Sequence, residues 1–297
     1  MRTRAATLAA LVWLASCAGP ERPAEGPASA DPAAAPTTAP RPFVAVSANI
    51  RYGTAKDGPD AWPLRRDQLV ERLAGHDAAI VGLQEALDFQ LAFLAERLPR
   101  YQRLGQGRDG GSRGEHAALL IDRERFEVVE HGDFWLSPTP EVTASVGWDA
   151  ALTRICTWAA LRDRGDGRTL TVWNVHFDHR GAQARLESAK LLLARIAAKP
   201  GPHLVLGDLN TGEASSPLVA LREAGLRDSY RDRHADGPAG TFHGFRGGQS
   251  GDKIDYVLVD AGLVTVAASI DAAAGPNGRW PSDHHFVAAT LRAAEAK

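Results

Sequence analysis

Residues 204–211 read Leu204-Val205-Leu206-Gly207-Asp208-Leu209-Asn210-Thr211, and this stretch shows the pattern that predicts the fold. An apolar run long enough for a buried strand ends directly in a glycine, a carboxylate and an amide. Glycine lets the backbone turn tightly, and Asp208 and Asn210, two residues apart, can project to the same side. A helix cap or an Asx turn would explain Asn210 alone but explains the pair poorly. The stretch therefore predicts a polar site at the end of a strand.

Five further polar motifs lie at the edges of apolar, strand-like runs. They are Asn49-Ile50-Arg51, Gln84-Glu85, Asn174-Val175-His176-Phe177-Asp178-His179, Lys253-Ile254-Asp255-Tyr256 and Ser282-Asp283-His284-His285. Strands with such ends gather hard oxygen ligands and imidazoles in one crevice. This combination is typical of a site that hydrolyses a phosphoester with a divalent cation.

The segments between these motifs predict the architecture. Helices are expected at Pro63–Ala74, Leu87–Leu98, Gly181–Ala198 and Ser216–Ala224. Strands are expected at 43–50, 78–83, 116–121, 126–129, 133–136, 155–161, 169–177, 203–206, 254–259, 263–270 and 286–292. Helix-connected strands at both ends, with hairpin-like strands between them, predict an α/β fold. We expect a four-layer α/β/β/α sandwich of two packed mixed sheets with outer helices.

The N-terminus predicts the compartment. Arg2 and Arg4 precede an apolar run, Ala5–Leu14, that is too short to span a bilayer. The following Leu14-Ala15-Ser16-Cys17 resembles the lipobox of bacterial lipoproteins, which implies cleavage before Cys17 and acylation of its thiol. The alternative is an ordinary signal peptide in which Cys17 is incidental.

Three segments follow from this interpretation. Residues 1–17 form a lipoprotein signal peptide with its lipobox ending at Cys17, and the Ala/Pro-rich residues 18–42 form a disordered tether. Residues 43–297 contain no second linker and are expected to form one catalytic domain. The domain would lie outside the cytoplasm, held by lipid to a bacterial membrane on its periplasmic or cell-surface side.

The charge balance bears on the class of substrate. The 297 residues carry a formal net charge of −2, and the three basic and three acidic side chains of residues 1–40 cancel. The folded part is therefore not basic, whereas tight sequence-independent binding to long nucleic acids depends on clustered Lys and Arg. The composition counts mildly against a high-affinity nuclease and indicates no protein partner.

Asp255 and His284 provide the sharpest mechanistic prediction. Asp255 lies in an otherwise apolar strand, where a carboxylate costs free energy unless it is paired. His284, just before the final strand, is its natural partner. An Asp that holds Nδ1 leaves Nε2 free to act on water as a general base. Asp283, beside it, can contribute a metal or water contact.

Other candidates have simpler alternative explanations. Glu85 can bind Mg²⁺ at the end of its strand, but a carboxylate there also suits a helix N-terminus. Asn49 can hold a phosphate oxygen or water, or simply end a strand in a turn. A histidine such as His176 on a strand is more often structural than catalytic. Its neighbours Asp178 and His179, before a helix start, favour a functional site.

Three charged residues and one histidine are expected to bind substrate. Arg154 precedes a strand, where its guanidinium can clamp phosphate through two hydrogen bonds. Arg108 and Glu115 lie in the Gly-rich stretch 105–115, which lacks the Gly-Lys-Ser/Thr ending of a Walker-type phosphate loop. A solvated, flexible loop is the alternative interpretation of that stretch. His179 completes the set.

Together these motifs resemble the endonuclease/exonuclease/phosphatase family, which has the DNase I-like fold, over nearly all of residues 43–292. The resemblance implies Mg²⁺ as the cofactor, with Mn²⁺ as an alternative. It implies that Glu85, Asn49 and Asp283 form the metal site. It also implies a catalytic set made of His284, Asp255, Asp208, Asn210 and His176. In this set, Asp255 orients His284, Asp208 and Asn210 handle the nucleophile and phosphate, and His176 stabilises the charged phosphate.

Two positions depart from the family pattern. Many nuclease members carry Asn-x-Asp at the first motif, whereas Arg51 occupies the acidic position here. One carboxylate fewer counts against a second tight metal site. The motif Ser282-Asp283-His284-His285 lacks the proline that often follows it, and we expect no effect from this.

The sequence predicts a divalent-metal-dependent phosphoesterase that hydrolyses a phosphodiester or phosphomonoester by in-line attack of activated water. Its substrate would be a small molecule or lipid head group. An extracytoplasmic nuclease acting on DNA or RNA is the alternative within the same class. A non-catalytic binding lipoprotein on the same fold is the alternative from another class, and it would be expected to lose some of the six motifs.

Overall fold

The computed structural model describes residues 39–295, which belong to one compact unit. Cys17, the signal peptide and residues 18–38 of the expected tether lie outside the described residues, so these assignments stay predictions. Among residues 39–295, no helix combines the length and the apolar character needed to cross a membrane.

Two six-stranded mixed sheets form the centre of the fold. The first contains, in spatial order, β11 (Leu263–Asp271), β12 (Phe286–Ala293), β1 (Phe43–Asn49), β2 (Ile80–Ala86), β4 (His116–Asp122) and β3 (Tyr101–Leu104). The second contains β5 (Phe126–Trp135), β6 (Ile155–Asp163), β7 (Thr169–His176), β8 (His203–Asp208), β10 (Asp255–Val259) and β9 (Arg227–Asp228). One pair in each sheet is parallel, β1 with β2 and β7 with β8, and the other pairs are antiparallel.

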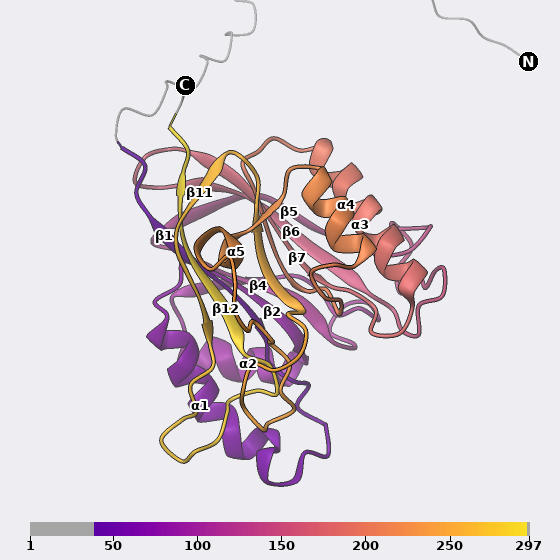
Figure 1. Ribbon diagram of the computed structural model, residues 1–297, viewed down its shortest axis with the longest axis vertical. Helices are drawn as coiled ribbons and strands as arrows, with labels where there is room; N and C mark the ends of the chain where they lie inside the picture. The colour runs from indigo at the N-terminus through magenta and orange to yellow at the C-terminus, as the bar shows by residue number, and fades with distance from the viewer. Residues whose placement is uncertain (1–38, 296–297) are drawn as a thin grey trace, which may run out of the picture. The chain divides into compact units, whose positions relative to one another are not determined.

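Helices cover the outer face of each sheet. Figure 1 shows α1 (Trp62–Gly75) and α2 (Asp88–Arg97) on one side, and α3 (Ala182–Ala197) and α4 (Ser216–Glu223) on the other. A 3₁₀ turn, Gly58–Asp60, precedes α1, and the short α5 (Ser229–Arg233) follows β9.

Three hydrophobic cores fill the spaces between these four layers. Between the sheets, side chains such as Ile80 and Leu119 pack with Leu204 and Val257. A second core joins α1 and α2 to the first sheet, and a third joins α3 and α4 to the second sheet. Burial of apolar surface on both faces of each sheet holds the layers together. The predicted α/β/β/α sandwich is confirmed.

The structure corrects one pair of expected strands. Segments 126–129 and 133–136 were expected as separate strands, but they form the single strand β5, with a register shift between Val128 and Glu130. Exposed polar residues in the middle of β5 hid its continuity. Because β5 is at the edge of its sheet, it tolerates such residues. The short elements β3, β9 and α5 were not expected.

A buried amide connects the two sheets close to the site. Asn174 on β7 donates through Nδ2 to the carbonyls of Leu83 (2.9 Å) and Ala118 (2.8 Å) in the first sheet. Its Oδ1 accepts a hydrogen bond of 2.7 Å from Gln84 Nε2. A Cβ atom at Gly82 would lie 2.8 Å from Asn174 Oδ1, so only glycine lets the sheets approach here. This bridge fixes the end of β2 relative to β7.

Candidate active site

A pocket of about 600 Å³ opens at the sheet edge where the polar motifs meet. Most of the residues predicted for the site line it, namely Glu85, Arg108, Glu115, Arg154, His176, His179, Asp208, Asn210, Asp283 and His284. Two more, Asn49 and Asp255, are fully buried directly behind it. The scattered motifs therefore meet in one cavity.

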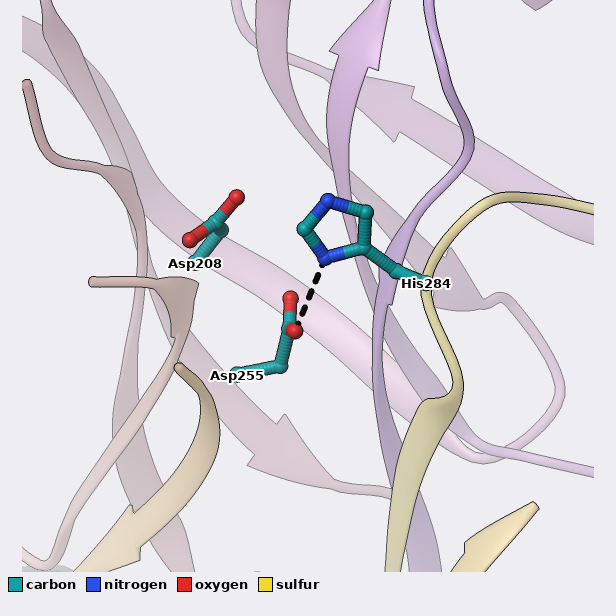
Figure 2. A group of neighbouring side chains, drawn as sticks. All are labelled: Asp208, Asp255 and His284. Carbon is teal, nitrogen blue, oxygen red and sulfur yellow. Dashed lines mark hydrogen bonds and ion pairs between the residues drawn. The ribbon is translucent and has the colours of Figure 1, made fainter. Parts of the chain in front are cut away.

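Asp255 and His284 form the expected pair. His284 Nδ1 lies 2.9 Å from Asp255 Oδ2, and Figure 2 shows the bond with Asp208 facing the same space. Asp255 opens β10, directly across from Asp208 at the end of β8. His284 precedes β12 in the other sheet. The pairing of β8 with β10 brings the two carboxylates together, and the packing of the two sheets adds His284.

The charges in this group are strongly coupled. Burial alone would lower the pKa of His284, but the Asp255 carboxylate outweighs it, and the pKa is raised well above its usual value. Burial and the nearby Asp255 carboxylate raise the pKa of Asp208 to about 7. Two carboxylates this close in a dry site cannot both be charged without a compensating cation. The His284 imidazolium or a cation in the pocket can supply this positive charge.

Ligand atoms of Asp208, Asp255 and His284 lie within 4.8 Å of one another, which makes this trio the metal-ligand cluster found in residues 39–295. Chemistry argues against it as a complete ligand set. The Asp255–His284 hydrogen bond occupies both Nδ1 and Oδ2, and breaking it would leave a buried carboxylate without its partner. Of the three, Asp208 has the carboxylate best placed to serve a cation.

Glu85, Asp283 and Asn49 form what we call the acidic half of the pocket. Asn49 Nδ2 donates to Glu85 Oε1 (3.1 Å) and to Asp208 Oδ2 (3.0 Å), so one amide holds two carboxylates near each other. Burial, with the Glu85 charge as a further cause, raises the pKa of Asp283. Clustered carboxylate oxygens are the donors that Mg²⁺ and Mn²⁺ prefer, so these residues fit such an ion.

Glu85 occupies an unusual backbone position. Its φ is +60°, and it lies inside β2, where the pairing with β4 shifts register between Leu83 and Ala86. The sequence analysis expected Glu85 directly after a strand, whereas the structure includes it at the end of β2. This bulge directs the side chain towards Asn49 and lets Oε2 accept a hydrogen bond from the Tyr52 N–H (3.0 Å).

Arg51, at the position that is acidic in many nucleases, contacts two carboxylates. Its guanidinium pairs with Asp57 at 2.9 Å and lies 3.6 Å from Asp283. Arg51 thus places a positive charge at the position where many nucleases have a further acidic residue. The expectation against a second tight metal site stays a prediction.

His176 lies between Asp208 and Glu115 of the Gly-rich loop. Its Nε2 is 3.5 Å from Asp208 Oδ2, and its Nδ1 is 3.9 Å from Glu115 Oε2. Burial, and next the charge of Arg154, lower the pKa of His176 far below its usual value. The imidazole is therefore neutral at neutral pH, and these contacts are not ion pairs. A neutral imidazole can still donate one N–H to a phosphate oxygen.

The Gly-rich stretch is an ordered loop. Arg108 N donates to the Glu115 carbonyl (2.9 Å), and Trp135 Nε1 donates to the Arg108 carbonyl (2.7 Å). Across the pocket wall, Arg108 Nη1 pairs with Glu115 Oε2 at 2.7 Å. Burial raises the pKa of Glu115. The alternative of a flexible, solvated loop does not describe these residues.

Arg154 offers free donors to the pocket. The side chain is 5% exposed, Nη2 lies 3.0 Å from His179 Nδ1, and Nη1 has no hydrogen-bond partner. Asp178, 3.4 Å from Arg154 Nε, accepts from the backbone N–H groups of Arg180 and Gly181. A buried guanidinium nitrogen without a partner is costly, so its position suits an anion that completes its bonding.

Asn210 both forms an Asx turn and lines the pocket, which are the two roles that its sequence context allows. Its backbone N–H donates to Asp208 Oδ1 (2.9 Å), which is the Asx turn, and its φ is +49°. Its side chain donates to the Phe177 carbonyl (3.0 Å) and lines the pocket.

Several pocket residues escaped the sequence analysis. Tyr52 and Leu152 line the cavity without any motif to mark them, and Ile254 lines it beside Asp255 of its motif. Phe242, which the sequence allows as a rim residue or as a core aromatic, lines it too, with its ring edge-on to His284 at a centroid distance of 5.1 Å. Trp62, which the sequence allows in the same two roles, is the first residue of α1 and is buried in the core between that helix and the first sheet. Apolar pocket walls cannot be told from core residues in a sequence.

Comparison with known proteins agrees with this geometry. Residues 46–284 match the model of the Endonuclease/Exonuclease/phosphatase family. A crystal structure of a family protein from Bacteroides thetaiotaomicron is 32% identical, covers 87% of this chain and 100% of its own, and superposes with a TM-score of 0.82. A mannosyl-6-phosphatase of the same organism is 33% identical, with 84% and 99% covered and a TM-score of 0.79.

The catalytic domain of human Nocturnin with bound sulfate is 18% identical over 85% of this chain and 94% of its own, with a TM-score of 0.69, which shows likeness of fold alone. Comparison with curated protein sequences gave no match. The family model matches most of the chain, and the two Bacteroides structures are each more than 30% identical to it. This chain belongs to the endonuclease/exonuclease/phosphatase family.

Proposed function

We propose that this protein is a divalent-metal-dependent phosphoesterase that uses water as its nucleophile. The observation that carries the proposal is the buried Asp255–His284 pair, which lies beside Asp208 at a pocket whose other side is acidic. Enzymes of this family hydrolyse phosphoesters and typically use divalent metals. A binding protein that had lost catalysis would have no need to keep a buried carboxylate–imidazole pair, which is costly to fold.

The residues divide the work of hydrolysis. Asp255 accepts the Nδ1 proton of His284 and so fixes the ring, and in the neutral form of the imidazole Nε2 can take a proton from the attacking water. The N–H groups of Arg154 and neutral His176, with the Asn210 amide, can bind the phosphate oxygens as charge develops on them. Glu85, Asp283 and Asp208 would hold Mg²⁺ or Mn²⁺. The bound ion would add positive charge that stabilises the phosphate in the transition state.

A small phosphoester is the substrate class that the chain favours. The net charge of −2 offers little attraction to a long polyanion. The mannosyl-6-phosphatase, 33% identical, is by its name an enzyme for a sugar phosphomonoester. We therefore place small phosphomonoesters and phosphodiesters ahead of DNA and RNA. The structural neighbours below 25% identity bear only on the fold.

Chromogenic substrates test the proposal. Purified residues 39–297 should hydrolyse p-nitrophenyl phosphate or its bis ester with Mg²⁺ or Mn²⁺, and EDTA should stop the reaction. His284→Ala should abolish turnover, whereas His131→Ala, an exposed change on the edge strand β5, should not. Absence of hydrolysis in a full panel of phosphomonoesters, phosphodiesters and nucleic acids would overturn the proposal. Undiminished turnover by His284→Ala would overturn the mechanism.

We also propose that lipid at Cys17 holds the domain outside the cytoplasm. The lipobox-like Leu14-Ala15-Ser16-Cys17 supports this proposal. Full-length protein expressed in a bacterium should incorporate labelled palmitate and sediment with membranes. Cys17→Ser should lose both properties. Equal sedimentation and labelling of the variant would contradict the proposal.

A further inference from the structure

Arg65 is a buried cation outside the pocket, and the mechanism above does not use it. It lies on α1 and is 2% exposed. All four of its hydrogen bonds go to backbone carbonyls: Nε to Asp60 (2.9 Å), Nη1 to Ile50 (2.8 Å) and Pro281 (2.8 Å), and Nη2 to Arg51 (2.9 Å). The guanidinium fork thus joins residues 50 and 51 to Pro281, which lies 216 positions after Arg65 in the sequence.

The joined segments carry the acidic half of the pocket. Ile50 and Arg51 directly follow Asn49, and Pro281 lies two residues before Asp283. One nitrogen, Nη1, contacts both segments, so it fixes the distance between them. A second contact, from Ser282 Oγ to the Asn49 carbonyl at 2.6 Å, closes the same junction.

Arg65 is expensive to bury. Its hydrogen-bond partners are neutral carbonyls, and its guanidinium packs against the rings of Trp62 and Phe245, with its central carbon 5.4 and 5.7 Å from their centroids. Burial lowers the pKa of Arg65 to about 10, while the Asp283 charge opposes that change. A methionine of similar length would fill the space without burying a charge. A purely structural plug would not need a guanidinium.

We propose that Arg65 is a positioning residue that clamps the ends of the two segments bearing Asn49 and Asp283, and so sets the affinity of the acidic half for a divalent cation. This inference rests on the proposed metal dependence. Residues that orient metal ligands without touching the metal typically change metal affinity by about 10- to 100-fold when they are replaced.

The direction of the change in cation affinity distinguishes a positioning role of Arg65 from a purely electrostatic one. Arg65 carries a positive charge near the acidic half, so by Coulomb's law alone its removal would tighten cation binding. A clamp predicts the reverse, because ligands that drift apart bind an ion more weakly. Lysine keeps the charge but cannot reach four carbonyls with one ammonium group. Arg65→Met and Arg65→Lys should therefore both weaken binding.

Arg66 provides a matched control. It lies next on α1, is partly exposed, and its guanidinium carbon is 4.8 Å from the centroid of the Phe93 ring, away from the clamped segments. Wild type, Arg65→Met, Arg65→Lys and Arg66→Met should be titrated with Mn²⁺ by calorimetry. The unfolding temperature of each should be measured with and without Mn²⁺, which provides a readout apart from catalysis.

The expected result is a dissociation constant about tenfold higher for both Arg65 variants and within twofold of wild type for Arg66→Met. A purely structural role would lower the unfolding temperature without Mn²⁺ and leave the dissociation constant of the folded protein unchanged, which would overturn the inference. Tighter binding by Arg65→Met would overturn it as well. Wild type that binds no Mn²⁺ yet hydrolyses phosphoesters would overturn both the metal proposal and this inference.

Discussion

The two halves of the pocket are assembled in different ways. In the base half, Asp208, Asp255 and His284, the central contact joins two oppositely charged side chains, with His284 Nδ1 2.9 Å from Asp255 Oδ2. In the acidic half, Glu85 is instead held by neutral donors, the Asn49 amide and the Tyr52 N–H, and Asp283 lies 3.6 Å from the Arg51 guanidinium. One half carries its own counterion, while the other gathers negative charge.

This difference predicts separable functions. The Asp255–His284 pair balances its own charge without any added ion. In the acidic half, the charges of Glu85 and Asp283 repel each other, and a cation is the natural way to balance them. Damage to the base half should therefore reduce the chemical step, and damage to the acidic half should reduce cation affinity.

The largest effect is expected at Asp255. Asp255→Asn keeps the shape but loses the carboxylate that holds the Nδ1 proton of His284, so kcat should fall by about 10³- to 10⁴-fold. Steady-state kinetics on a chromogenic phosphoester measures this loss. Calorimetry with Mn²⁺ provides the contrast, since the dissociation constant should stay within a few-fold of wild type. A dissociation constant that worsens as much as kcat would erase the distinction between the halves.

The next largest effect is expected at Glu85. Glu85→Gln keeps the size of the side chain but removes a charged oxygen ligand, and cation affinity should fall by about 10- to 100-fold. At saturating Mn²⁺ much of kcat should return. Failure to recover at any Mn²⁺ concentration would mean that Glu85 acts in the chemical step as well.

A pH dependence of stability sharpens the comparison for the base half. Asp255 raises the pKa of His284 in the folded protein, so the pair adds stability that is complete below the unfolded-state pKa, about 6.5. This stability is lost as pH rises through the higher folded-state value. Urea unfolding without metal should therefore show a larger loss for Asp255→Asn at pH 6 than at pH 9. Equal losses at both values would contradict the raised pKa.

The smallest effect is expected where the sheets are joined behind both halves. Asn174→Ala leaves two buried carbonyls without their donor and should cost about 1–3 kcal/mol in the free energy of unfolding. Thr169→Ala, at the exposed start of β7, is the control and should change stability little. Since Asn174 touches neither half, kcat and cation affinity should both stay close to wild type.

Some contacts of the site could be predicted from the sequence, and others could not. The Asp255–His284 contact was predictable because a lone carboxylate inside an apolar strand needs a partner, and few candidates exist. The order of the strands was not predictable, because it depends on pairing between distant segments. Arg65 gave no sequence signal at all, since its partners are backbone carbonyls, which every residue has.

The sequence by itself determined the layers and the kinds of group that end the strands, because apolar periodicity and local turn chemistry are properties of neighbouring residues. Only the tertiary structure decided that Asn49 holds Glu85 and Asp208 together, and that Arg65 ties residue 50 to residue 281. Such contacts form when sheets pack and distant strand ends meet. Their geometry depends on the whole core rather than on any one segment.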